Sequence, residues 1–236
     1  MSFLTEFDMV KNIYGKLYES QAKKLDLCST PRIKVMLDMT DELGLKNNRI
    51  LDIGCYDGTF LSLIRNRGNE FYGIEASDYG VKEAAAKGVV VQKLFVGDDM
   101  RFPFNDNFFD LVIIGEIIEH IYDTDFFLSE IRRILKIKGS LLVSTPNIAS
   151  LGRRIMLLLG MNPIIELSPN EADSSGHIRY FTFVSLRCLL EKHGFRIIKS
   201  SSDVVNFSGD GRFRSLFLPK LFPTIGQSII YLCESS

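Results

Sequence analysis

The sequence predicts an α/β protein with a doubly wound, mostly parallel sheet in a single domain. Strand-like apolar runs alternate with helix-like segments through the middle of the chain. Such alternation produces right-handed βαβ units, in which helices cover both faces of a parallel sheet. With 236 residues, of which 46% are hydrophobic, the chain is long and apolar enough to bury one sizeable core.

Five apolar runs are predicted as strands of this sheet, with helix-like segments between them. The strands are predicted at 49–53, at 71–75, within 89–96, at 110–114 and at 140–145. The helices are predicted at 59–67, 79–87 and 126–137, and Gly139 is the expected stop of the last one.

The segments on either side of these strands carry further elements. Two helices are predicted before the first strand, at 3–25 and 31–43. After residue 147 we expect a helix at 148–160 with a very apolar end, and then a loop. A helix at 183–193 capped by Thr182, a strand near 195–200 and a last strand at 227–232 complete the prediction.

Composition excludes several classes of protein. The formal net charge is -1, so there is no overall basic footprint for nucleic acid. The four cysteines form no C-x-x-C pair, which argues against a disulfide framework or a structural zinc site. Since neither a secretory signal nor a spanning apolar stretch is recognisable, we expect a cytoplasmic protein.

Acids and glycines follow the first two predicted strands. Asp52 lies on the first strand, Gly54 and Gly58 bracket the turn into the next helix, and Glu75 ends the second strand. Ligands of doubly wound sheets bind beyond the carboxyl ends of strands, where such an acid can accept hydrogen bonds from ribose. A nicotinamide cofactor fits poorly, because Tyr56 stands at the second glycine of its fingerprint and nearby acids would repel a diphosphate.

Six segments in order resemble those of the class I S-adenosylmethionine-dependent methyltransferases, over about residues 43–202. They are LDIGCYDG (51–58), FYGIEAS (71–77), GDDMRFPF (97–104), NFFDLV (107–112), EIIEH (116–120) and LLVSTPN (141–147). The resemblance implies a seven-stranded sheet with an antiparallel last hairpin. It also implies S-adenosylmethionine as cofactor and S-adenosylhomocysteine as product.

The resemblance assigns cofactor contacts along these segments. The loop after the first strand would hold the methionine part of the cofactor. The end of the second strand would bind its ribose, and the residues after the third strand would bind its adenine. Tyr56 departs from the family, which usually has glycine there. The implied cofactor-binding residues are Asp52, Gly54, Cys55, Tyr56, Gly58, Glu75, Ala76, Asp98, Asp99 and Glu116.

The same resemblance divides the chain. Residues 1–45 are expected to form helices that cap the cofactor site, and residues 46–236 the methyltransferase core. Within the core, about 148–180 would be a substrate-covering insertion. An LLLG-x-x-P-like stretch in it is similar to the methionine-biosynthesis protein W family.

Two histidines are the candidate catalytic residues. His120 follows Glu116 and Glu119 at a spacing that predicts one shared helix face. Three interpretations stay open: His120 is a general base, Glu116 contacts the cofactor while Glu119 and His120 only order the loop, or the group binds a divalent metal. In the third, less favoured than the base, Glu116, Glu119, His120 and His177 would be the ligands, as in similar methyltransferases of small RNA ends and quinone precursors.

The second histidine lies in GHIRYFT (176–182), which resembles the H-x-R-x-F-[ST] segment of small-molecule and sugar methyltransferases. That resemblance would turn His177, Arg179 and Tyr180 toward the acceptor. Phe181 is expected in the core, and Thr182 as a helix N-cap.

The predicted function is therefore methyl transfer to a small-molecule or glycan acceptor. One alternative is a cofactor-binding regulatory partner without turnover, and another is a metal-assisted methyltransferase of a different acceptor class. Apolar residues with basic neighbours at 153–160 and 213–220 suggest peripheral contact with a membrane. The sequence leaves the oligomeric state open.

Overall fold

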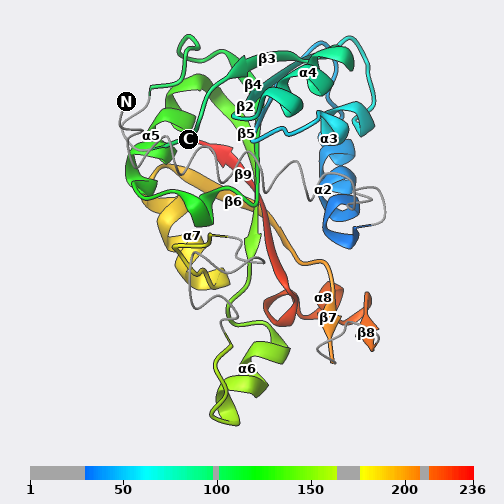
Figure 1. Cartoon of the computed structure of the whole chain (residues 1–236), viewed down its shortest axis with the longest axis vertical. Coiled ribbons are helices and arrows are strands. Elements are labelled where there is room, and N and C mark those ends of the chain that lie inside the picture. Colours follow the sequence, from blue (N-terminus) through cyan, green and yellow to red (C-terminus); the bar gives the residue numbers. More distant parts are fainter. Residues whose placement is uncertain (1–29, 98–100, 164–175, 208–212) are drawn as a thin grey trace, which may run out of the picture.

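The computed structural model describes residues 30–97, 101–163, 176–207 and 213–236. Its centre is a seven-stranded sheet in the order β3-β2-β1-β4-β5-β9-β6 (Figure 1). Strand β9 runs antiparallel to the other six strands. The doubly wound, mostly parallel fold is thereby confirmed, including the antiparallel last strand. The strands are β1 (Arg49–Ile53), β2 (Glu70–Glu75), β3 (Val90–Lys93), β4 (Phe109–Gly115), β5 (Leu135–Pro146), β6 (Phe195–Ser201) and β9 (Ser228–Ser235).

Helices cover both faces of this sheet, as Figure 1 shows. The helices α2, α3 and α4 lie on one face, and α5 and α7 lie on the other. Their bounds are α2 (Pro31–Glu42), α3 (Thr59–Leu63), α4 (Asp78–Ala86), α5 (Thr124–Ile134), α6 (Leu151–Leu158), α7 (Phe183–Lys192) and α8 (Leu218–Leu221). A short pair, β7 (Val205–Asn206) and β8 (Arg214–Ser215), is separate from the main sheet.

Strand alternation explains the two faces. On β1, Ile50 packs into the cluster beneath α2, whereas Leu51 and Ile53 pack into the cluster beneath α5 and α7. Because successive strand side chains point to opposite faces, Asp52 lies on the same face as Ile50. The acid is therefore held by the strand, not by a loop.

The predicted end of the helix before β5 is wrong. Helix α5 stops at Ile134, and Leu135 is already extended and paired with Phe109 of β4. Gly139 lies inside β5, at a register shift, where an added Cβ would be 2.8 Å from the Lys136 carbonyl oxygen. The absence of a side chain at Gly139 therefore permits a kink within the strand. Its neighbour Lys138 has a positive φ of 61°.

The other helices and strands predicted within the described residues are confirmed with small changes in their bounds, and the substrate-covering role of about 148–180 stays a prediction. Helix α3 is shorter than expected, since Ile64 is already extended. Thr182 caps α7 in a capping box, and His193 is its C-cap. The helix predicted at 3–25 lies outside the described residues, so the role assigned to residues 1–45 stays a prediction.

Candidate functional site

The turn after β1 depends on two glycines. Gly54 and Gly58 have φ values of 79° and 72°, in the left-handed region where only glycine is unstrained. An added Cβ at Gly58 would lie 3.1 Å from the Cα of Ala84, so this glycine also allows α4 to pack closely. Backbone conformation and packing alone thus explain why positions 54 and 58 are glycine. The two glycines shape the loop at the carboxyl edge of the sheet.

Two buried carboxylates flank this loop. Glu75 accepts hydrogen bonds from the backbone N–H groups of Tyr56 (3.1 Å) and Ser77 (2.7 Å). Burial, together with the charge of Glu75, raises the pKa of Asp52 to about 8. A cationic ligand beside these acids would relieve this unfavourable concentration of negative charge.

The other predicted residues of the loop have structural partners. Tyr56 adopts a positive φ of 47°, a conformation that favours glycine, at the position where the family usually has glycine. Burial, with the nearby charges of Asp52 and Glu75, raises the pKa of the Cys55 thiol, so this thiol is not activated as a nucleophile. Ala76 is exposed beside Glu75.

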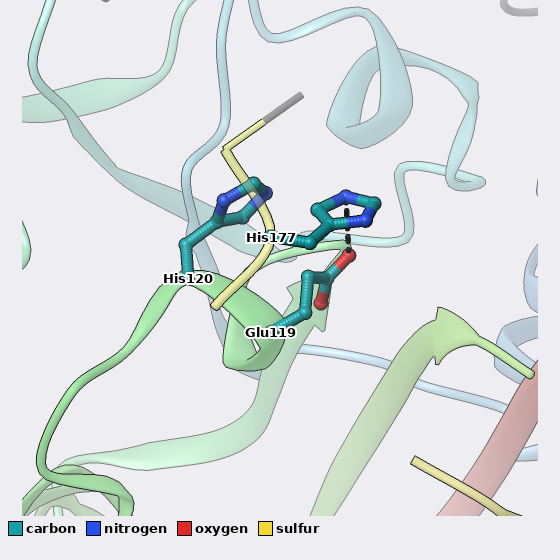
Figure 2. A group of neighbouring side chains, drawn as sticks. All are labelled: Glu119, His120 and His177. Carbon is teal, nitrogen blue, oxygen red and sulfur yellow. Dashed lines mark ion pairs between the residues drawn. The ribbon is translucent and has the colours of Figure 1, made fainter. Parts of the chain in front are cut away.

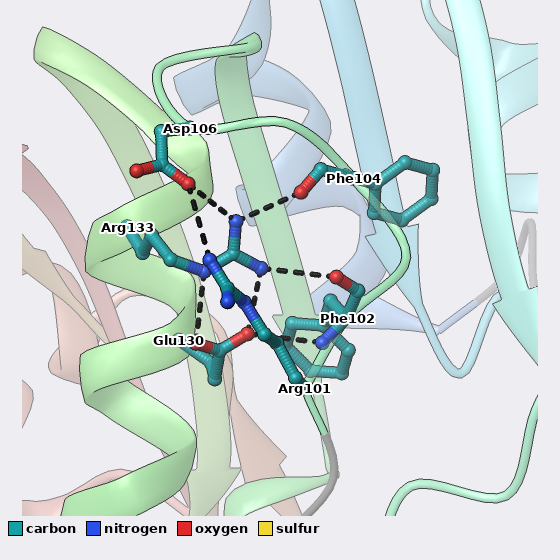
Figure 3. Close-up of polar contacts among 6 residues, drawn as sticks. All are labelled: Arg101, Phe102, Phe104, Asp106, Glu130 and Arg133. Carbon is teal, nitrogen blue, oxygen red and sulfur yellow. Dashed lines mark hydrogen bonds and ion pairs between the residues drawn. The ribbon is translucent and has the colours of Figure 1, made fainter.

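Arg133 of α5 anchors the segment that leads from β3 into the start of β4 (Figure 3). Its guanidinium forms ion pairs with Glu130 and Asp106, each at 2.7 Å, and donates to the carbonyl oxygens of Phe102 and Phe104. This anchors the chain that follows residue 100. The adenine contacts predicted for Asp98 and Asp99 lie just before it, outside the described residues.

Glu116 does not share a helix face with the two residues predicted beside it. It follows β4 with a positive φ of 57°, whereas Glu119 and His120 belong to the separate 3₁₀ turn η2 (Ile118–His120). Its Oε1 pairs with the Arg32 Nη1 at 2.5 Å and accepts from the Ser144 hydroxyl at 3.1 Å. The helical prediction for 116–120 is therefore wrong.

Arg32 is the site residue that sequence reasoning missed. It comes from the first turn of α2, far along the chain from Glu116. Its Nε is buried and has no hydrogen-bond partner in the part of the chain that the structure describes. No local motif marks it, because only the packing of α2 on the sheet brings it to the edge.

Glu119, His120 and His177 come together, as Figure 2 shows. One ligand atom from each lies within 4.8 Å of the others. The His177 Nε2 is 3.8 Å from Glu119 Oε1, and the two imidazole centroids are 4.8 Å apart. We call this group the His–Glu cluster.

The tautomer of His120 follows from its partner. Its Nδ1 is 3.1 Å from the Gly176 carbonyl oxygen, which can only accept a hydrogen bond. The Nδ1 therefore carries the proton in the neutral ring. The lone pair is then on Nε2, where it can accept a proton or bind a metal.

Glu119 is almost fully buried, with 1% of its surface exposed. Burial raises its pKa to about 7, although the Thr145 hydroxyl, 2.9 Å from Oε2, and the charge of Arg32 act in the opposite direction. Its Oε1 has no hydrogen-bond partner among the described residues. The cluster thus holds a carboxyl group whose ionisation burial disfavours.

The segment predicted to turn toward the acceptor is partly tied down. The backbone carbonyl of Glu119 accepts from the N–H groups of Ile178 and Arg179 at 3.0 and 3.1 Å. The Arg179 guanidinium donates to the carbonyl oxygens of Ile121 and Tyr122, so it fastens the segment to η2. Of the predicted acceptor-facing residues, Tyr180 is partly exposed and His177 joins the cluster.

Membrane-spanning helices are not found among the described residues, since none of those helices is long and apolar enough.

Sequence comparison identifies the family. A methyltransferase-domain family matches residues 29–200. The ubiquinone biosynthesis O-methyltransferase of Pelagibacter ubique is 30% identical over 128 residues, 53% of this chain and 52% of that protein. The norajmaline N-methyltransferase of Rauvolfia serpentina is 36% identical over 100 residues, covering 40% of this chain and 34% of that one. The chain thus spans about half, or less, of the length of these curated relatives.

Solved structures agree in fold. A structure from Thermotoga maritima, described as a SAM-dependent methyltransferase and possible histamine N-methyltransferase, has a TM-score of 0.62 and 19% identity. It covers 99% of this chain and 96% of that one. The [4+2]-cyclase SpnF is as similar, with a TM-score of 0.61, 19% identity and coverage of 96% and 94%. The fold alone therefore does not define a reaction. The sequence match does define the family, and the cofactor of that family is S-adenosylmethionine. The chain belongs to the class I S-adenosylmethionine-dependent methyltransferases.

Proposed function

We propose that the chain transfers a methyl group from S-adenosylmethionine to a small-molecule or glycan acceptor. The observation that carries the proposal is the His–Glu cluster at the same edge of the sheet as the glycine loop and the two buried acids. The loop proposed to bind the cofactor and the residue proposed to accept a proton therefore follow strands at the same edge of the sheet. The relatives named for quinone and alkaloid methylation act on small molecules, which supports this acceptor class.

The residues of the first two strands fit the cofactor. It supplies an activated methyl group on a positively charged sulfur. Glu75 would bind the ribose hydroxyls while keeping the loop ordered through Tyr56 and Ser77. Asp52 supplies negative charge near the cationic part, and Arg32 offers a buried, open N–H donor to a carboxylate.

His120 is the residue we assign to the proton of the acceptor. Its Nε2 lone pair would take a proton from a hydroxyl or amine as the new bond to the methyl carbon forms. The carbonyl of Gly176 holds the ring in that tautomer. His177 and Glu119 lie behind it and stabilise the imidazolium that results.

A metal-assisted reaction is the second candidate, because one carboxylate and two imidazoles converge. Mixed oxygen and nitrogen ligands suit manganese, with waters completing the shell. The open Oε1 of Glu119 fits such a role. Glu116 does not fit, since Arg32 already occupies its Oε1, so the set of four ligands expected from the sequence is reduced to three.

The test is turnover by the purified chain with S-adenosylmethionine and a panel of phenols, amines and sugars. We expect S-adenosylhomocysteine to form with at least one acceptor. The same assay with a chelator, and then with added manganese, separates the base from the metal. Tight cofactor binding without turnover on any acceptor would contradict the proposal and favour a regulatory, non-catalytic role.

A further inference from the structure

The largest concentration of exposed apolar side chains lies at one end of the molecule. Eleven of the twenty large hydrophobic residues that are exposed among the described residues belong to two segments. We call this surface the apolar tip. Its members are Ile155, Leu157, Leu158, Leu159, Met161, Phe207, Phe213, Leu216, Phe217, Leu221 and Phe222.

The two segments form one surface. Figure 1 shows α6 together with β7, β8 and α8 at the end of the molecule where β5 finishes. The Arg154 guanidinium donates to the carbonyl oxygen of Thr224 at 3.0 Å, and Gly152 approaches the carbonyl of Asn206. Helix α6 has no buried residue, so its leucines do not contribute to the core. Surfaces of this apolar character mark interaction sites.

Charge indicates what the apolar tip contacts. Residues 151–163 contain Arg153 and Arg154 and no acid, and residues 213–224 contain Arg214 and Lys220 and no acid. The Arg154 guanidinium donates to the backbone carbonyls of Ala149 and Thr224, which do not neutralise its positive charge. A partner therefore has to be apolar over a wide area and negatively charged at its rim. An anionic lipid bilayer has both properties.

The tip also adjoins the candidate active site. The residue that ends β5 is Pro146, and α6 begins five residues later. Next to this junction, the Ile148 N–H donates to the carbonyl of Phe181 at 2.9 Å. Phe181 belongs to the segment that carries His177. The start of the tip is therefore tied to the segment that carries His177.

We propose that the apolar tip seats the protein on the surface of an anionic bilayer. Leucine and phenylalanine side chains enter the headgroup boundary, and the four cations meet lipid phosphates. This proposal goes beyond methyl transfer and does not require it. Binding and turnover are therefore measured separately, and either can fail alone.

The test is flotation of the full chain with lipid vesicles. One set is phosphatidylcholine alone, and the other contains about one third phosphatidylglycerol, which supplies the negative surface potential. We expect the chain to float with the anionic vesicles, to float less with the neutral ones, and to be released by high salt. A chain that stays at the bottom with anionic vesicles overturns the proposal.

The matched variants replace exposed apolar residues inside and outside the apolar tip. Leu158→Glu with Phe217→Glu is expected to lower the vesicle-bound fraction about tenfold or more, since two apolar side chains no longer leave water. Ile137→Glu with Val184→Glu, at two positions that are each 72% exposed, is expected to leave binding unchanged. Equal loss in both pairs overturns the proposal.

Self-association is the competing outcome. Size-exclusion chromatography of the wild-type chain over a range of concentrations measures it. A dimer that the Leu158→Glu and Phe217→Glu pair dissociates, without vesicle binding by the wild type, would make the tip an interface between copies and overturn the membrane proposal. Because these residues lie outside the core, the variants are expected to fold, which circular dichroism checks.

Discussion

The carboxyl edge of the sheet carries two regions of opposite construction. The cofactor loops follow β1 and β2, where Asp52 and Glu75 are buried and Glu75 accepts hydrogen bonds from two backbone N–H groups. The apolar tip is built from elements added after β5, and its helix α6 buries none of its residues. The first region is part of the folding core, whereas the second is stabilised only locally. We therefore expect that mutations can change cofactor binding without changing the proposed binding of the apolar tip to a bilayer, and the reverse.

The largest effect is expected at the junction of the two regions. His120→Ala should lower kcat by about 10²–10⁴-fold, the usual contribution of a positioned general base. Cofactor affinity should change little, because the acids of β1 and β2 are intact. Turnover and calorimetry measure the two quantities. The control His193→Ala removes the C-cap histidine of α7 and should keep full turnover; equal losses in both variants would argue against the assignment.

Glu75→Ala tests the cofactor region itself. It removes the carboxylate that holds the N–H groups of Tyr56 and Ser77 and that faces the proposed ribose position. Loss of charge-assisted hydrogen bonds costs about 1.5–3 kcal/mol, so the Kd for S-adenosylmethionine should rise about tenfold to a hundredfold. Glu70→Ala, at the exposed start of the same strand, is the control. A folded Glu75→Ala chain with unchanged Kd would move the pocket elsewhere.

Asp52→Asn tests the charge of the cofactor region through the pH dependence of the free energy of unfolding. The pKa of Asp52 is about 8 in the folded chain against an ordinary value of 3.8, so between these values the folded state holds a proton that the unfolded state releases. The free energy of unfolding should therefore fall as pH rises through this window, and the slope should weaken in Asp52→Asn. Urea unfolding at several pH values measures it.

The same variant changes cofactor binding. A cation bound near Asp52 favours the ionised carboxylate, so wild-type affinity should rise as pH approaches 8, and the variant should lose this dependence. The exposed Asp38 offers a control in Asp38→Asn. An identical pH dependence in wild type and Asp52→Asn would rule out Asp52 as its source.

The smallest effect is expected in the apolar tip. Leu158 is 85% exposed, so Leu158→Ala should change the free energy of unfolding by less than about 0.5 kcal/mol. Leu142, fully buried in the interior strand β5, is the contrast: Leu142→Ala should lower the free energy of unfolding by about 2–5 kcal/mol. Similar losses in both would show that the tip belongs to the folding core after all.

Much of the fold could be predicted because its signals are local. Apolar runs at 49–53 and 110–114, and the capped start of α7 at Thr182, record short-range preferences that the structure retains. The glycine at 139 misled the prediction, since a glycine also permits a kink inside a strand. Whether a glycine ends a helix or permits a kink inside a strand is decided by the register of the sheet. That register depends on the neighbouring strand.

The site was predicted in part for the same reason. The glycines and acids after β1 and β2 were found because a strand end and its loop are continuous in sequence. The spacing of Glu116, Glu119 and His120 was misread as a helix, although only the last two share the 3₁₀ turn. Arg32, which holds Glu116, comes from another helix and carried no signal.

The sequence by itself determined the family, the order of strands along the chain and the residues of the cofactor loop, because these depend on periodicity and on neighbours in the chain. The tertiary structure decided which charges meet. It paired Arg32 with Glu116, brought His177 onto Glu119, and placed α6 beside β7 to form one apolar surface. Those contacts join distant segments, and only the packing of helices on a common sheet brings such segments within reach of each other.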